Sequence, residues 1–273
     1  MSELNTRARR YTEDAPEYGR LLRESRGVAR IVAPNPGPMT YHGTNTWLVE
    51  TDEGCVVIDP GPDDPAHQRA VLAGAGGQVR AIVVTHGHAD HERGAPALAR
   101  LADAPILGGS HGPALVDQST VCGLRVIATP GHTMDHICLD IGENRLIAGD
   151  HIMGWSSSVV MRAPHGSMDA YLTSLKTIHE KHYALVLSGH GPPITEPHPF
   201  IEGLIRARQR RLAQIHAMLG PDWQSEATLL ERIYKNLAAP LRPAATEVLG
   251  ATLEALQTRG QAVRNADGAW RKA

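Results

Sequence analysis

The chain has 273 residues and is 42% hydrophobic, which is enough for one large domain, or a large and a small one, with an apolar core. Its net charge is −2 and it has no apolar run of 18 residues, so we expect neither general nucleic-acid affinity nor a membrane span. The three cysteines lack metal-binding spacing, and residues 1–20 lack the apolar segment of a signal peptide. We therefore expect a cytoplasmic protein with free thiols.

The first two thirds of the chain alternate strands with short helices. Apolar or alternating runs bounded by glycine and proline predict strands at 28–33, 44–50, 54–59, 79–84, 105–108, 124–128, 136–141, 145–149 and 184–188. Helical periodicity predicts helices at 64–75, 95–102 and 168–181. This order is typical of an α/β domain, and we assign residues 1–197 to it.

The pattern becomes helical after the last strand. Apolar positions at helical spacing predict a long helix at 201–218 and two more at 225–237 and 243–259. A turn at 265–268 between two short strands predicts a closing hairpin. Three helices followed by a hairpin is the order of a winged helix, so residues 198–273 form a predicted second domain.

A dense group of metal-binding residues follows one predicted strand. The run Thr-His-Gly-His-Ala-Asp-His begins at Thr85, directly after the strand at 79–84. It supplies three imidazoles and a carboxylate, from His86, His88, Asp90 and His91. A single loop histidine is usually solvated, but a cluster like this at a strand end needs a positive charge among its members. The run therefore predicts a metal site.

Three further strands end in residues of the same kind, which are His132, Asp150 and His190. Strand ends at one edge of a sheet converge, so all seven side chains can share one pocket. A catalytic zinc takes about three protein ligands plus water, so seven donors fit two ions about 3.5–4 Å apart with one bridging carboxylate. Asp150 suits the bridge because it stands alone in its loop and has two oxygens.

A centre of this kind predicts hydrolysis. Two Zn²⁺ lower the pKa of a shared water to near neutrality or below, which gives a metal-bridging hydroxide that attacks a carbonyl or a phosphorus. Such a hydroxide requires no serine or cysteine nucleophile. Asp90 and Asp150 are the predicted catalytic carboxylates. Mixed imidazole and carboxylate ligands are compatible with Zn²⁺, Mn²⁺ or Fe.

Four motifs together resemble those of one family. They are the run beginning at Thr85, Thr-Pro-Gly-His at 129–132, Gly-Asp at 149–150 and Gly-His-Gly-Pro at 189–192. In this order and at these spacings they resemble the metallo-β-lactamase superfamily over residues 27–193. The resemblance implies an α/β fold, an αββα sandwich with the metals at one edge.

The resemblance also implies a role for each ligand. The first metal would be held by His86, His88 and His132. The second would be held by Asp90, His91 and His190. Asp150 would bridge the two. Asp59, at the end of the strand at 54–59, matches an aspartate that supports the metal-binding histidines from behind.

Three shorter matches resemble the subgroup that carries a C-terminal winged helix. They are Gly-Thr-Asn-Thr-Trp-Leu-Val at 43–49, Thr-Met-Asp-His at 133–136 and Ile-Tyr-Lys-Asn at 233–236. The animal member of this subgroup is a mitochondrial endoribonuclease, so the resemblance implies a phosphodiesterase acting on single-stranded RNA. Two alternatives stay open. One is a glyoxalase II-like hydrolase of thioesters or lactones, and the other is a nucleic-acid-binding protein with a non-catalytic metal site.

Several further residues are predicted to meet partners. Substrate contact is predicted for Asn45, Trp155, Ser156 and Ser157, of which the last three follow Asp150 and would line the pocket mouth. The long helix carries Arg206, Arg208, Arg210 and Arg211. These arginines either contact RNA phosphates or form the polar side of a helix that packs on the catalytic domain or on a second copy in a homodimer, and we favour packing. The expected substrate is a small molecule or single-stranded RNA.

Overall fold

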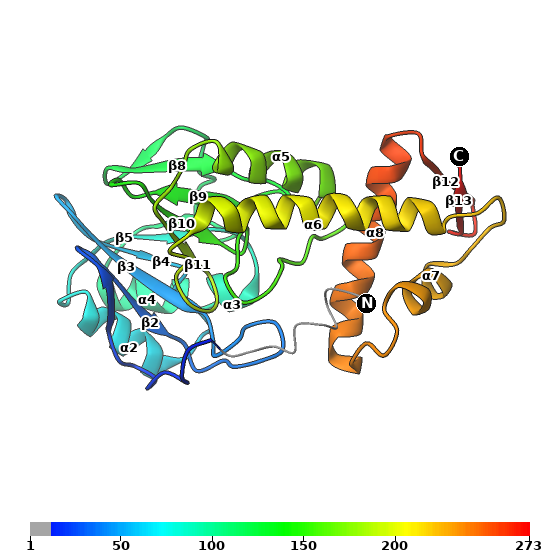
Figure 1. The fold of residues 1–273 in the computed structure, drawn as a ribbon. Helices are drawn as coiled ribbons and strands as arrows, with labels where there is room; N and C mark the ends of the chain where they lie inside the picture. Colours follow the sequence, from blue (N-terminus) through cyan, green and yellow to red (C-terminus); the bar gives the residue numbers. More distant parts are fainter. Residues whose placement is uncertain (1–11) are drawn as a thin grey trace.

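Two β-sheets packed face to face form the centre of the first domain, and helices cover both outer faces (Figure 1). The computed structural model describes residues 12–273, so the first 11 residues of the predicted polar leader lie outside the described residues. The αββα sandwich and the C-terminal winged helix predicted from the sequence are both confirmed.

The first sheet has six strands that follow one another in chain order. They are β1 (Leu22–Ser25), β2 (Val28–Val32), β3 (Asn45–Thr51), β4 (Gly54–Ile58), β5 (Val79–Val84) and β6 (Ile106–Gly108). Its outer face is covered by α2 (Pro65–Gly74) and α4 (Ala95–Ala102). On β5, Ile82 packs toward these helices whereas Val83 packs toward the second sheet. Burial on both faces explains why this strand is apolar from Ala81 to Val84.

The second sheet has five strands in the order β11-β10-β9-β8-β7. They are β7 (Thr120–Val121), β8 (Leu124–Ala128), β9 (Ile137–Asp140), β10 (Arg145–Gly149) and β11 (Leu185–Ser188). Its outer face packs on α5 (Met168–His179) and α6 (Pro197–Met218). The elements not predicted from the sequence were β1, β7, the four-residue α3 (Ala89–Glu92) and the 3-10 helix η1 (Ala239–Leu241). Each is too short for the spacing of its apolar residues to indicate a strand or a helix.

Strand direction explains why the predicted ligands converge. β4 runs parallel to β5, and β10 runs parallel to β11. β8 and β10 are each antiparallel to β9, so they run in the same direction as one another. β3 is antiparallel to β4, so its start lies beside the end of β4. A bridge between Thr44 and His190 joins the two sheets at this edge.

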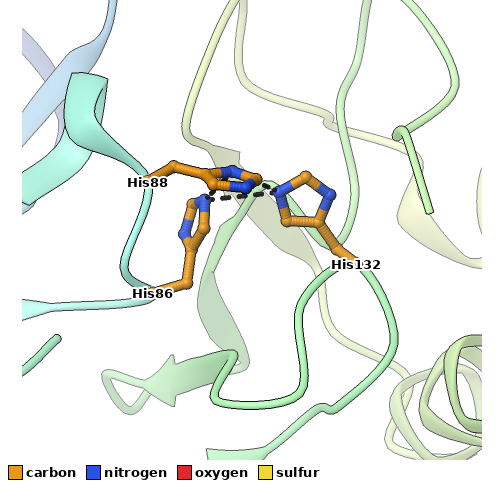
Figure 2. A group of neighbouring side chains, drawn as sticks. All are labelled: His86, His88 and His132. Atoms are coloured by element: carbon orange, nitrogen blue, oxygen red, sulfur yellow. Dashed lines mark hydrogen bonds between the residues drawn. The ribbon is translucent and has the colours of Figure 1, made fainter. Parts of the chain in front are cut away.

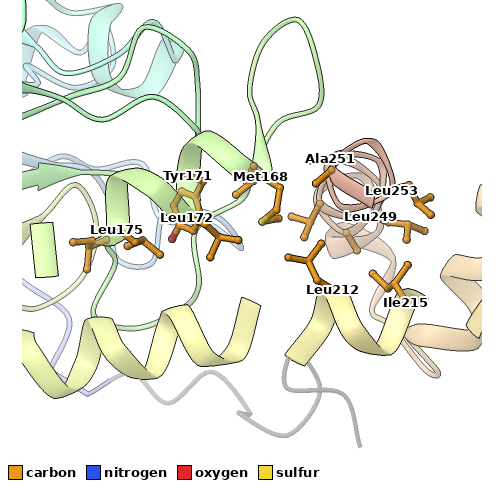
Figure 3. Packing of buried hydrophobic residues seen from close by; sticks show 14 of the residues in the cluster. Met168, Tyr171, Leu172, Leu175, Leu212, Ile215, Leu249, Ala251 and Leu253 are labelled. Atoms are coloured by element: carbon orange, nitrogen blue, oxygen red, sulfur yellow. The ribbon is translucent and has the colours of Figure 1, made fainter. Parts of the chain in front are cut away.

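The C-terminal domain shares its apolar core with the catalytic domain. It consists of α6, α7 (Glu226–Ile233), η1, α8 (Arg242–Thr258) and the hairpin of β12 (Ala262–Arg264) and β13 (Trp270–Lys272). Figure 3 shows Met168 and Leu172 of α5 beside Leu212 of α6 and Leu249 of α8, all in one buried cluster. The long α6 therefore ties the winged helix firmly to the sandwich (Figure 1).

Three of the four arginines of α6 have partners that fit the packing interpretation. Arg208 is buried, donates a hydrogen bond to the carbonyl of Ser158 and lies over the Tyr171 ring. Arg206 pairs with Glu202 one turn earlier, and Arg211 lies over the ring of Tyr234. The three cysteines are free thiols, as predicted. Among residues 12–273, no helix combines the length and the apolarity needed to cross a membrane.

Stability should fall in acid partly because of His67. This side chain is buried, with Nε2 2.8 Å from Thr46 Oγ1, and burial lowers its pKa from 6.5 to about 4. The unfolded chain binds a proton at His67 near pH 6.5 and the folded chain does not. The free energy of unfolding should therefore drop by about 1.4 kcal/mol per pH unit between pH 6.5 and 4 through this group alone.

The measurement is urea unfolding at several pH values for the wild type and His67→Gln. Metal loss in acid affects both proteins, so it cancels in the difference between their slopes. The variant should show the shallower dependence, and equal slopes would contradict the prediction.

Candidate metal centre

Three histidines from two loops form the first group of ligands (Figure 2). The Nε2 atom of His86 lies 3.0 Å from Nδ1 of His88 and 3.3 Å from Nε2 of His132. The remaining pair, His132 Nε2 and His88 Nδ1, is 3.0 Å apart. In a tetrahedral site with metal–nitrogen bonds of about 2.0–2.1 Å, ligand atoms are about 3.4 Å apart. The trio is therefore spaced to hold one ion.

A second group lies beside the first. It consists of Asp90, His91 and His190. Nε2 of His190 lies 3.3 Å from Nε2 of His91 and 3.2 Å from Oδ2 of Asp90, and the third distance, from His91 Nε2 to Asp90 Oδ2, is 3.7 Å. This trio joins residues that are about 100 positions apart in the chain, because β5 and β11 end at the same edge.

Asp150 lies between the two groups. Its Oδ1 is 3.4 Å from Nε2 of both His91 and His190, whereas its Oδ2 is 3.8 Å from Nε2 of His132. One carboxylate oxygen therefore faces each trio, as a bridge between two ions requires. Oδ1 is buried and has no hydrogen-bond partner among the described residues. A buried oxygen without a partner is costly, and a bound cation would satisfy it.

Hydrogen bonds fix which nitrogen faces the centre in three of the histidines. The Nδ1–H group of His91 donates to Asp59 Oδ2 at 2.8 Å, and that of His190 donates to the Gly43 carbonyl at 3.2 Å. The Nδ1–H of His132 donates to the carbonyl of Val159. With Nδ1 protonated, each Nε2 keeps its lone pair for a metal.

Asp59 supports one histidine of each trio. It accepts hydrogen bonds of 2.8 Å from both the backbone N–H and the Oγ1 of Thr85, besides the bond from His91. Thr85 Oγ1 is in turn 3.0 Å from Nδ1 of His86. Asp59 has a φ of 52°, a left-handed conformation that aspartate tolerates better than most residues. The sequence suggested the supporting aspartate, but the relay through Thr85 emerged only from the structure.

The charges of the centre favour a bound cation. Burial lowers the pKa of His91, but Asp150, Asp59 and Asp90 outweigh burial and raise it well above its ordinary value. Burial raises the pKa of Asp150, but His190 and His91 outweigh that effect and hold it well below its ordinary value. Burial also lowers the pKa of His86, which keeps that imidazole neutral. The carboxylates thus draw positive charge into the centre, and a donor set of carboxylates and imidazoles fits divalent metal ions.

A glycine allows the His190 loop to approach the bridge. A Cβ atom on Gly189 would lie 2.5 Å from Asp150 Oδ1 and 2.7 Å from Cε1 of His91. Both distances are shorter than any side chain tolerates, so the close approach of β11 to the centre requires glycine at this position.

Asn45 occupies a different place from the one predicted. Its side chain is buried and donates hydrogen bonds to the carbonyls of Ser188 (3.0 Å) and Gly191 (2.8 Å), on either side of His190. Its Oδ1 accepts a hydrogen bond from Arg30. Asn45 therefore braces the loop that carries His190, and this placement argues against contact with substrate.

A cavity of about 700 Å³ opens over the centre. Its floor is formed by His88, Asp90, His132 and Asp150. The catalytic domain supplies walls of Met39, Met153, Val159 and Met161. The winged-helix domain supplies the remaining wall, from Ala239, Arg242, Pro243, Ala244, Thr246 and Glu247. None of these wall residues is among the four that were predicted to contact substrate.

Trp155 and its neighbours lie beside the cavity rather than in its lining. Trp155 is buried against Met153 and Tyr41, whose ring centroid is 5.1 Å away. Neither Ser156 nor Ser157 is among the described residues that line the cavity. The stretch after Asp150 does border the cavity, but Met153 and Val159 line it instead.

The motifs and the geometry now agree with known proteins. Residues 39–115 match the metallo-beta-lactamase superfamily, and residues 225–270 match the beta-lactamase associated winged helix domain. A beta-lactamase-like protein 2 homolog of Drosophila melanogaster is 30% identical over 271 residues, which cover 88% of this chain and 91% of the relative. The chain belongs to the metallo-beta-lactamase superfamily. As a member of a superfamily of metal-dependent hydrolases, it is an enzyme of that class.

Two further relatives extend the comparison. A beta-lactamase domain protein from Burkholderia ambifaria has the same fold, with a TM-score of 0.83, 20% identity and 96% of each chain covered. A protein of Emericella nidulans named thioesterase pkgB is 32% identical over 206 residues, which cover 70% of this chain and 58% of the relative. Members of this superfamily therefore include a protein named for acyl chemistry.

Replacing Asp59 by asparagine should weaken metal binding. An amide cannot accept hydrogen bonds at its nitrogen, so either His91 or Thr85 loses its partner. Loss of such a partner typically costs 10- to 100-fold in metal affinity. Metal content after dialysis against a weak chelator should fall in Asp59→Asn but not in Asp63→Asn, which alters an exposed carboxylate nearby. Equal metal content in the two variants would contradict the role of Asp59.

Proposed function

We propose that this chain is a dinuclear zinc hydrolase of thioesters, or of closely related esters, whose acyl group is apolar. One observation carries the proposal: the cavity over the metal centre is walled by Met39, Met153, Val159 and Met161. Methionine side chains form a soft, adaptable apolar surface that suits an aliphatic chain. Single-stranded RNA, in contrast, is usually bound by stacking aromatic rings and a positively charged groove.

The charged residues of the cavity wall are paired. Arg242 pairs with Glu231, and Glu247 lies 3.4 Å from Arg162. These pairs leave the wall with little net charge to attract a phosphate backbone. An uncharged acyl group therefore fits the wall better than a polyanion does.

The reaction adds water across the acyl carbon–sulfur bond. When bound, two Zn²⁺ would acidify a water and polarise the acyl carbonyl. The two trios and Asp150 would hold the two ions. The apolar walls orient the acyl chain and exclude other water. Asp90 lines the cavity and its side chain is 32% exposed, so its carboxylate can accept a hydrogen bond that orients the attacking water. A carbon–oxygen bond forms, the carbon–sulfur bond breaks, and the thiol leaves with a proton.

Single-stranded RNA is the second candidate substrate. It is favoured by the winged-helix match and by the charge of residues 198–273, which contain 11 Lys and Arg against 7 Asp and Glu. Phosphodiester cleavage could use the same two ions, since they stabilise attacking and leaving oxygens equally well.

Purified protein loaded with Zn²⁺ should be tested in parallel on an acyl thioester, single-stranded RNA and a generic phosphodiester. We expect turnover of the thioester. Cleavage of RNA with no turnover of the thioester would overturn the proposal in favour of the second candidate. Metal analysis should find about two ions per chain.

The variants Asp90→Asn and His190→Ala should abolish hydrolysis while the fold survives. Each removes a ligand of the second trio, and metal ions supply several kcal/mol of transition-state stabilisation, so turnover should fall by a factor of about 10² or more. His165→Ala, which removes an exposed histidine outside both trios, is the matched control. Circular dichroism would verify folding, and full activity in both ligand variants would rule out the metal mechanism.

A further inference from the structure

One side of the cavity is formed by the winged-helix domain. The stretch 239–247 covers η1 and the first turns of α8, and six of its residues line the cavity. We propose that this stretch sets the length of the acyl chain that the enzyme accepts. The inference rests on the proposed function and deepens it, because it assigns the winged helix to substrate selection.

The winged helix can act as a fixed wall because Arg162 of the catalytic domain binds to it. The guanidinium of Arg162 donates a 2.9 Å hydrogen bond to the Thr246 carbonyl and lies 3.1 Å from Glu226. Arg162 directly follows Met161, which lines the cavity from the catalytic domain. A Cβ atom on Gly250 would lie 2.3 Å from Cζ of Arg162, so glycine makes room for the guanidinium. These contacts of Arg162 therefore fix the distance between the catalytic-domain wall and the winged-helix wall.

The burial of α8 argues against a nucleic-acid role for this domain. In a winged helix the third helix reads a groove, so it must present an exposed face. Here every residue from 248 to 253 is buried, and Figure 3 shows Leu249, Ala251 and Leu253 within the apolar cluster. The first turns of α8 border the cavity instead. The middle of α8 therefore packs in the apolar cluster, and its first turns line the cavity.

Small side chains in this wall leave room for the substrate. Ala239 and Ala244, whose side chains are single methyl groups, line the cavity together with Val159 and Met161. Burying one further methylene of an acyl chain is worth about fourfold in kcat/KM. A bulky residue in place of either alanine should remove space for the distal methylenes and leave the carbonyl end beside the metals.

The test uses the full Zn²⁺-loaded chain and a series of N-acetylcysteamine thioesters from acetyl to decanoyl. For the wild type, kcat/KM should rise with chain length until the cavity is filled. Ala244→Phe should lower the ratio of decanoyl to acetyl kcat/KM at least tenfold. Ala238→Phe, an exposed residue of the same segment that does not line the cavity, should keep the wild-type ratio.

Two more variants make the outcome decisive. Ala239 is exposed, so Ala239→Phe decides the question if Ala244→Phe does not fold. Met161→Ala, which enlarges the cavity from the catalytic domain, should shift the optimum to longer chains. A wild-type ratio in a folded Ala239→Phe or Ala244→Phe protein that still hydrolyses acetyl thioester overturns the inference alone. Absence of thioester turnover in the wild type overturns the proposed function, and the inference with it.

Discussion

The buried carboxylate of Asp150 is the constraint on which the rest of the site depends. Its two oxygens face two separate trios of ligands, and Oδ1 has no hydrogen-bond partner among the described residues. Such a group is stable only if positive charge lies beside it. The surrounding structure supplies that condition, because the strand ends of both sheets deliver imidazoles to the same edge.

Much of the remaining architecture keeps these groups in place from behind. Asp59 and Thr85 orient a histidine of each trio, and Asn45 braces the loop of His190. All three are buried and lie at strand ends. Buried hydrogen bonds at the ends of rigid strands hold donors more firmly than loops alone can, so the ligands keep their spacing.

The winged helix encloses one side of the cavity over the metal centre. Taken alone, the sandwich would leave its metal centre under an open cavity bounded by methionines. The shared core of α5, α6 and α8 carries the stretch 239–247 across that opening, and Arg162 fixes it there. A domain expected to bind nucleic acid or to pack thus supplies part of the cavity wall.

The sequence by itself determined most of the strands, the long helices and all seven proposed ligands. Each ligand directly follows a strand or lies in a short motif. Strands and motifs of this kind can be recognised from the spacing of apolar residues in the sequence. Only the tertiary structure decided what surrounds them. Asn45 and Trp155 were expected at the substrate but are buried in packing, whereas Met161 and Ala244 line the cavity. The side of a loop that lines a cavity depends on contacts between segments about 80 residues apart. A local sequence pattern cannot predict such contacts.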